Sequence, residues 1–182
     1  MPTFPIPAYR AAVIADVPAI VVLVESAYRG ESGLRGWTTE THLLDGQRTD
    51  AQSVAELIDR DGSIVLLAEH DGTLLACCHI ERQGPAGYFG MFAVSPELQC
   101  GGLGRSVLAE AERLAQVQWQ ASAMRMSVIE QRAELIAWYE RRGYQLTGET
   151  RPFPYGQPRF GVPLRDDLRF VWMSKPLAGV AA

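Results

Sequence analysis

The sequence predicts an α+β fold, a meander of strands with helices on both of its faces. Three apolar runs of strand length follow one another between residues 63 and 94, and Asp71-Gly72 between the first two is a strong hairpin signal. Two longer segments, around residues 17–28 and 103–115, instead repeat their apolar residues at helical spacing. Consecutive strands with helices before and after them indicate the α+β class.

Local signals support each element along the chain. Asp16 is a good N-cap and Pro18 fits the first turn of the first helix, whereas Gly143 is suited to end the last one. The predicted strands cover residues 9–13, 63–69, 73–81, 88–94, 124–129, 144–149 and 168–175, and the predicted helices lie around residues 17–28, 53–60, 103–115 and 133–142. Residues 30–50 are expected to form a loop with short helical pieces.

A proline-rich segment at residues 149–167 separates the last two predicted strands. A connection of this length inside a compact domain is usually functional or else disordered. Its aromatic residues favour packing over disorder. The segment contains Pro152, Phe153, Pro154, Tyr155, Pro158, Phe160 and Pro163.

Composition and charge restrict the class of protein. The 182 residues fit a single domain, with a core from about residue 9 to 175 and a frayed tail at 176–182. The net charge of −4 disfavours nucleic acid as a partner, and no apolar run approaches the roughly 20 residues that span a membrane. Three cysteines and no recognisable leader favour the cytoplasm. No metal site is expected, because these histidines lack ligand spacing: His42, His70 and His79.

The most informative segment joins the strand at 88–94 to the helix that follows it. The strand ends in Val94-Ser95-Pro96, and residues 99–104 read Gln-Cys-Gly-Gly-Leu-Gly. A helix that begins on glycines leaves its first backbone N–H groups accessible and carries partial positive charge there, so it suits a phosphate group. A Walker loop does not fit, because Arg105-Ser106 follows the last glycine, and Val107 stands where a dinucleotide fingerprint needs glycine or alanine.

This segment resembles the acyl-CoA-binding motif of the GNAT superfamily of N-acetyltransferases. In that family a strand ending near Val-x-Pro leads to Gln/Arg-x-x-Gly-x-Gly/Ala and a long helix, and a later helix carries a tyrosine like Tyr139, followed by residues like 141–144. The resemblance implies αβα layers around a mixed, mostly antiparallel sheet of about six to seven strands, and an acyl-CoA-dependent N-acetyltransferase. The matching motif positions are Val94, Pro96, Gln99, Gly102 and Gly104.

The same resemblance implies where acetyl-CoA binds. The backbone of residues 91–94 would pair with the pantetheine arm like an added strand, and one of its N–H groups would stabilise the developing oxyanion. The glycine turn would hold the pyrophosphate, with a contact from Arg105 unless that side chain is only solvated. The predicted cofactor contacts are Met91, Phe92, Ala93, Val94, Gln99, Cys100, Gly101, Gly102, Leu103, Gly104 and Arg105.

The catalytic and acceptor residues follow less completely from the resemblance. Tyr139 would hydrogen-bond or protonate the departing thiolate, or else it is a core aromatic residue. Several family members place a glutamate where this chain has Tyr88, so Tyr88 is expected near the acceptor, and Glu81 is a candidate base unless it is only exposed. The asparagine that the family often has before the tyrosine helix is missing here, which departs from the family's pattern at one cofactor contact; Arg132 stands near its place and is a further candidate cofactor contact. Trp37 either shapes the acceptor pocket or packs in the core.

Acetyl-CoA is therefore the expected donor, and the primary amine of a small molecule is the expected acceptor, which attacks directly in a ternary complex. Two alternatives are open: acetylation of protein N-termini or lysines, and acyl-CoA binding without catalysis. Arg151, Arg159 and Arg165 in the proline-rich segment either pair with a carboxylate of the acceptor or are solvated. A homodimer fits the resemblance, because edge strands commonly pair in this family.

Overall fold

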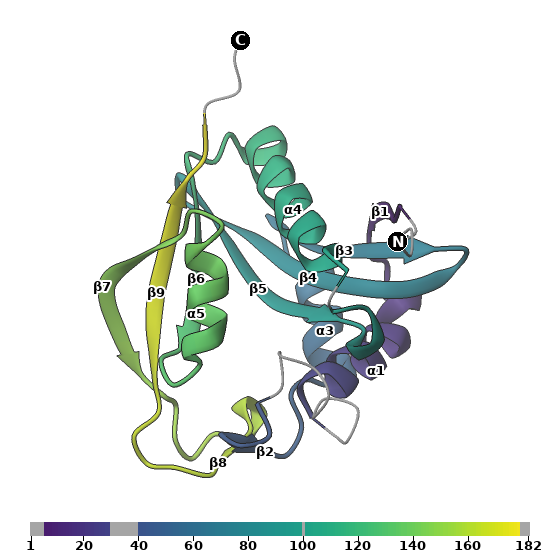
Figure 1. Cartoon of the computed structure of the whole chain (residues 1–182). Helices are drawn as coiled ribbons and strands as arrows, with labels where there is room; N and C mark the ends of the chain where they lie inside the picture. Colours follow the sequence, from purple (N-terminus) through teal and green to yellow (C-terminus); the bar gives the residue numbers. More distant parts are fainter. Residues whose placement is uncertain (1–5, 30–39, 100, 179–182) are drawn as a thin grey trace.

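The computed structural model describes residues 6–29, 40–99 and 101–178, and a seven-stranded sheet forms its centre (Figure 1). The strand order is β1-β3-β4-β5-β6-β9-β7, and every neighbouring pair is antiparallel except β5 and β6. The strands are β1 (Ala8–Ala11), β3 (Ser63–His70), β4 (Thr73–Gln83), β5 (Ala86–Val94), β6 (Ala123–Ile129), β9 (Arg169–Pro176) and β7 (Gln145–Pro152). The predicted α+β class with a mostly antiparallel sheet is confirmed.

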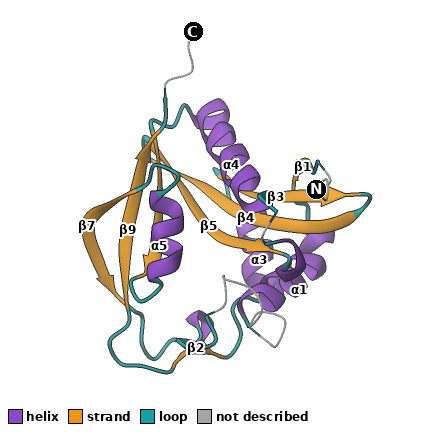
Figure 2. Cartoon of the chain, viewed as in Figure 1, coloured by secondary structure: helices purple, strands orange, loops and turns teal. Residues whose placement is uncertain are grey.

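Helices cover both faces of this sheet, as Figure 2 shows by colour. Along β3, Val65 and Leu67 pack with α1 and α3, whereas Leu66 and Ala68 pack with α4 and α5. This division arises because successive side chains of a strand point to opposite faces. The helices are α1 (Val17–Tyr28), α3 (Ala51–Asp59), α4 (Leu103–Trp119) and α5 (Ala133–Glu140).

Local sequence signals explain where several of these elements begin and turn. The hairpin between β3 and β4 turns on Asp71 and Gly72, both in the left-handed region at φ 48° and 75°. Asp50 accepts a hydrogen bond from the Ser53 N–H at 2.7 Å, so α3 begins at Ala51, slightly earlier than predicted. The predicted hairpin is confirmed at the predicted residues.

The sheet opens between its two parallel strands. β5 pairs with β6 only from Ala86 to Tyr88, and the rest of β5 pairs with β4 on its other edge. Met91 has a φ of 42°, and the register between β4 and β5 shifts near Cys77, so β5 bends at this point. Figure 1 shows β5 and β6 together at one end and apart at the other. The carboxyl-terminal half of β5 therefore has no partner on its β6 side among the described strands.

The predicted loop at 149–167 contains regular structure, which corrects the expectation of a plain connection. β7 runs beyond its predicted end, a 3-10 turn spans Pro158–Phe160, and β8 (Val162–Pro163) pairs with β2 (Leu44–Asp45). Such short strands leave no periodicity in the sequence from which to predict them. A small cluster of buried residues anchors the segment: Leu43, Leu44, Ile129, Phe153 and Leu168.

Candidate active site

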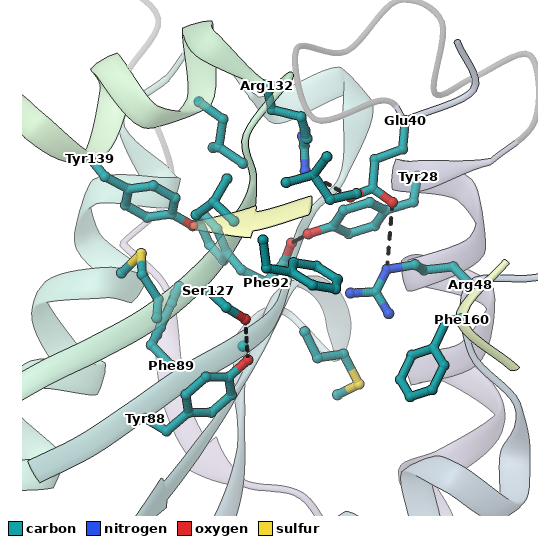
Figure 3. Close-up of a pocket in the computed structure, with 17 residues that line it drawn as sticks. Tyr28, Glu40, Arg48, Tyr88, Phe89, Phe92, Ser127, Arg132, Tyr139 and Phe160 are labelled. Carbon is teal, nitrogen blue, oxygen red and sulfur yellow. Dashed lines mark hydrogen bonds and ion pairs between the residues drawn. The ribbon is translucent and has the colours of Figure 1, made fainter. Parts of the chain in front are cut away.

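A cavity of about 350 Å³ lies where β5 and β6 separate (Figure 3). Its wall is built by α1, β5, β6 and α5, together with loop residues that precede α3 and α5, Phe160 of the 3-10 turn and Phe170 of β9. This volume is near the lower end of the usual range for small-molecule sites, about 300–1,000 Å³. Its lining includes Tyr28, Tyr88, Phe92, Arg132, Tyr139 and Phe160.

Tyr139 lies on α5 and directs its hydroxyl into this cavity (Figure 3). Its ring meets the rings of Phe89, Trp138 and Tyr144 edge-on, with centroid distances of 6.4, 5.1 and 5.8 Å. Burial raises the pKa of Tyr139 well above its ordinary value, and the nearby Tyr28 raises it further. The phenol is therefore protonated at neutral pH and acts as a hydrogen-bond donor in the cavity.

The bent half of β5 leads from the cavity to the glycine turn. Met91 and Phe92 line the cavity, and the next two residues of the strand are buried. The Tyr28 hydroxyl donates a hydrogen bond to the carbonyl of Phe92, and Gln99 Nε2 donates one to the carbonyl of Val94 at 3.2 Å. These two side chains hold the strand in place beside the opening between β5 and β6.

The glycine turn starts α4 with two glycines that have different structural roles. Gly102 has a φ of 84°, and no side chain among the described residues caps the first N–H groups of the helix. Gly104 is buried, and a Cβ atom there would lie 3.2 Å from the Phe92 ring and 3.6 Å from the Trp138 ring. The turn therefore offers bare N–H groups to an anion through Gly102, whereas Gly104 allows α4 to pack closely on β5.

A second, smaller hollow of about 210 Å³ lies beside this turn, and Gly101, Leu103 and Ser106 contribute to its wall. Gly101 donates a backbone hydrogen bond to the Leu98 carbonyl at 3.3 Å, and Arg105 is exposed. Cys100 lies outside the described residues. Apart from Arg132, the predicted cofactor residues that are described thus follow one path, from the cavity wall along β5 to the start of α4.

A buried ion cluster forms the side of the cavity opposite Tyr139 (Figure 3). Glu40 accepts hydrogen bonds from Arg132 Nη1 at 2.9 Å and from Arg29 Nη1 at 3.1 Å, and Arg48 Nε lies 3.8 Å from the carboxylate. Burial alone would raise the pKa of Glu40, but Arg132, Arg48 and Arg29 together hold it below its ordinary value. The carboxylate is therefore ionised at neutral pH, and it lies between the guanidinium groups of the three arginines and holds them together.

The sequence did not indicate this ion cluster. Arg132, expected only as a cofactor contact, also has a buried carboxylate as its ion partner. Arg132 stands at the N-cap of α5, lines the cavity and pairs with Glu40 at 2.9 Å. Glu40 and Arg48 come from the stretch predicted only as a polar loop. Single polar residues in a loop carry no spacing signal, so their meeting with Arg132 becomes visible only in the folded chain.

The remaining predicted residues lie in different places. Tyr88 lines the cavity, and its hydroxyl lies 3.2 Å from Ser127 Oγ of β6. Glu81 instead forms an ion pair with Arg60 at 3.2 Å and is not part of the cavity wall. Trp37 lies outside the described residues. The structure thus brings Tyr88, but not Glu81, to the cavity that contains Tyr139.

Two further properties concern the described parts of the chain. No helix there is both long and apolar enough to cross a membrane. Within the same ranges, no three His, Cys, Asp or Glu side chains gather closely enough to hold a metal ion.

Solved structures share this architecture. The chain is similar to the ribosomal-protein-S18-alanine N-acetyltransferase from Escherichia coli, with a TM-score of 0.68, 16% identity and 96% of each chain covered. It is also similar to a ribosomal-protein-alanine N-acetyltransferase from Brucella melitensis, with a TM-score of 0.66 and 24% identity over 93% of this chain and 99% of that one. Salmonella typhimurium yncA, a putative acetyltransferase with its cofactor acetyl-CoA, gives a TM-score of 0.66 and 19% identity over 97% and 96%.

These likenesses establish the fold, and no curated protein matches the chain. A family model gives the decisive comparison. The model of the acetyltransferase (GNAT) family matches residues 23–144, which contain the second half of α1, the β3–β5 meander, the glycine turn and the tyrosine helix. The chain therefore belongs to the acetyltransferase (GNAT) family and is an N-acetyltransferase.

Proposed function

We propose that the protein transfers the acetyl group of acetyl-CoA to the primary amine of a small molecule, by direct attack in a ternary complex. The observation that supports this most strongly is the position of the Tyr139 hydroxyl, which faces a small cavity at the point where β5 loses its β6 partner. The thioester would lie against the open edge of β5, between this hydroxyl and the ion cluster.

The glycine turn would hold the pyrophosphate of the cofactor. A pyrophosphate presents several acceptor oxygens and about two negative charges to the uncapped N–H groups at the start of α4. From there the pantetheine arm would follow the backbone of residues 91–94 as an added strand. Both proposals make use of backbone groups that no other described strand or side-chain cap occupies.

In the chemical step, the amine nitrogen forms a bond to the thioester carbon and the carbon–sulfur bond then breaks. A backbone N–H near Phe92 would stabilise the intermediate oxyanion, a contribution of about 3 kcal/mol for one donor. The departing thiolate would receive a hydrogen bond from Tyr139. Full proton transfer from an ordinary phenol to a thiolate costs about 2 kcal/mol, and the raised pKa of Tyr139 increases this cost, so a hydrogen bond is favoured.

The amine must also lose a proton, and we assign no side chain to this step. Glu40 is the one carboxylate in the described wall of the cavity, and its lowered pKa makes it a weak base. Glu81 remains a prediction without support from its position beside Arg60. We propose that water in the cavity accepts the proton.

A purified-protein assay with acetyl-CoA and a panel of amines tests this function. Release of free CoA thiol and the mass of the acetylated product would be measured, with reactions lacking an acceptor as the control. Small primary amines should react faster than peptides with a free N-terminal alanine or an internal lysine. Faster reaction of the peptides would contradict the small-molecule acceptor. Binding of acetyl-CoA without release of CoA thiol in the presence of any of the acceptors would identify a binding module.

A further inference from the structure

Arg48 differs from the other two arginines of the ion cluster in its accessibility. Its side chain is 33% exposed, whereas those of Arg29 and Arg132 are 9% and 6% exposed. Its only described ion partner is Glu40, and the 3.8 Å separation is too long for a hydrogen bond. Figure 3 shows the terminal nitrogens of Arg48 directed towards the interior of the cavity, across from Tyr139.

The rest of the structure holds this guanidinium in place. Glu25 of α1 accepts hydrogen bonds from the backbone N–H groups of Arg48 and Thr49, at 2.6 and 2.8 Å. The guanidinium carbon lies 5.0 Å from the centre of the Tyr28 ring, and that ring is itself fixed by its hydrogen bond to Phe92. Arg48 is therefore a preorganised set of donors at the cavity wall, rather than a freely moving surface side chain.

The charges around the cavity do not cancel. Three arginines, Arg29, Arg48 and Arg132, meet the carboxylate of Glu40, and Glu25 adds a second negative charge behind Arg48. One positive charge remains in excess beside a wall that includes several aromatic side chains. Such a site disfavours an acceptor whose only charges are ammonium groups, since both partners would be cationic in a poorly solvated space.

We propose that the acceptor carries an anionic group in addition to its amine, and that Arg48 binds this group. This inference rests on the proposed function and specifies its substrate class as small amino acids or similar amines with a carboxylate. The fork of guanidinium N–H groups matches a carboxylate geometrically. With the anionic group at Arg48, the amine of a small acceptor lies on the side of the cavity that faces Tyr139.

The arginines of the proline-rich segment are less suited to this role. Arg165 forms a bidentate pair with Asp167, and Arg151 pairs with Glu149 at 3.3 Å. Arg159 lies over the ring of Phe160, at 4.7 Å from its centre, and is exposed. None of these three belongs to the described wall of the cavity. The carboxylate partner expected from the sequence is therefore placed at Arg48 instead.

Matched acceptors provide the first test. L-leucine, L-leucinamide and isoamylamine share a side chain and an amine, but only the first carries a carboxylate. We expect kcat/KM for the free acid to exceed that of the other two by about tenfold or more, as for a hydrogen-bonded charge pair. The corresponding aminophosphonate separates carboxylate recognition from general anion recognition. Equal rates for acid and amide, or faster reaction of a polyamine, would overturn the proposal.

Variants of Arg48 provide the second test. Arg48→Gln should raise KM for the free acid about tenfold or more and leave the acetyl-CoA KM nearly unchanged. It should not lower the rate with isoamylamine, because the variant removes a positive charge that opposes this ammonium ion. Arg48→Lys should restore part of the acid preference, because it restores the charge without the fork. Arg113→Gln, at an exposed pair with Glu110 on α4, is the matched control and should retain the acid preference. Loss of the preference in Arg165→Gln but not in Arg48→Gln would return the role to the proline-rich segment.

A binding measurement distinguishes failure of the role assigned to Arg48 from failure of the proposed function. N-acetyl-L-leucine, which has the carboxylate but no reactive amine, should bind the wild-type protein by calorimetry and lose this binding in Arg48→Gln. Acetyl transfer only to amines that lack an anionic group would leave the proposed function intact and reject the role of Arg48. The absence of acetyl transfer to any amine would reject the proposed function itself, whatever the acetylated amino acid binds.

Discussion

At the scale of single residues, Tyr139 provides the clearest test of the chemistry. We expect Tyr139→Phe to lower kcat by about ten- to a hundredfold, the effect of losing one hydrogen bond to a charged group. The ring contacts with Phe89 and Tyr144 do not involve the hydroxyl, so acetyl-CoA affinity should change little. Steady-state kinetics at saturating acceptor and calorimetric titration with acetyl-CoA measure the two quantities. An unchanged kcat would remove Tyr139 from the mechanism.

Glu40 supports a residue-scale prediction about stability. Replacement by Gln leaves Arg29 and Arg132 without their buried partner, and we expect a loss of about 3–5 kcal/mol in the free energy of unfolding. The control is Glu149→Gln, an exposed partner of Arg125 that should change stability by at most about 1 kcal/mol. Urea unfolding at pH 7 measures both. A loss below 1 kcal/mol for Glu40→Gln would show that the arginines find other partners.

The pH dependence of this effect has a definite sign. The pKa of Glu40 is lower in the folded chain than the ordinary value of about 4.3, so its stabilising contribution is complete above that value. The contribution disappears as the pH falls through the folded pKa. The difference between wild type and Glu40→Gln should therefore shrink only below about pH 4.3.

These residues also show which parts of a site a sequence can predict. Tyr139 belongs to a continuous stretch that resembles the family's tyrosine helix, so it could be chosen as a candidate from the sequence, and in the structure it lines the cavity. Glu40 and Arg132 are 92 positions apart and meet only because the segment before β2 lies beside the N-terminus of α5. No local pattern contains that pairing, and the same is true of Arg48.

At the scale of secondary-structure elements, the glycine turn combines two constraints that can be separated by mutation. Gly104→Ala brings a methyl group within 3.2 Å of Phe92, and such overpacking should cost about 1–3 kcal/mol of stability and displace the cavity wall, lowering kcat. Gly102→Ala meets no atom within 4 Å, but its left-handed backbone should cost about 1–2 kcal/mol and weaken acetyl-CoA binding.

Ala109→Gly, at an exposed position of the same helix, is the control for a simple loss of helix stability of about 1 kcal/mol. It should leave both kcat and acetyl-CoA affinity unchanged, as measured by the assays above. If Gly104→Ala and Ala109→Gly behave alike, the close packing of α4 on β5 has no influence on the cavity.

Elements with strong periodicity or turn chemistry were predicted well, and short elements were not. The β3–β4 hairpin was predicted because Asp71-Gly72 fixes its turn between two apolar runs. β2 and β8 have two residues each, and their pairing depends on a buried cluster around Phe153 that joins two distant loops. The separation of β5 from β6 was also absent from the prediction, since it depends on where pairing stops rather than on composition.

At the scale of the whole molecule, the interior of the sheet links stability to pH. His79 lies on β4, is 5% exposed, and its Nε2 lies 2.9 Å from Ser63 Oγ on β3. Its ring centre is 6.4 Å from that of Tyr88, which lines the cavity on β5. His79 therefore contacts both neighbouring strands, β3 through Ser63 and β5 through Tyr88, in the part of the sheet that borders the cavity.

Burial lowers the pKa of His79 to about 4, although Glu81 opposes this shift. In the unfolded chain its pKa is about 6.5, so between these values the unfolded state binds a proton that the folded state does not. The free energy of unfolding should therefore fall as the pH drops from about 6.5 to about 4, by up to about 1.4 kcal/mol per unit from this residue. In His79→Gln that slope should be reduced, whereas the exposed His42→Gln should retain it. Urea unfolding at pH 7, 6 and 5 measures the slopes, and equal slopes in wild type and His79→Gln would show that other groups control the acid lability.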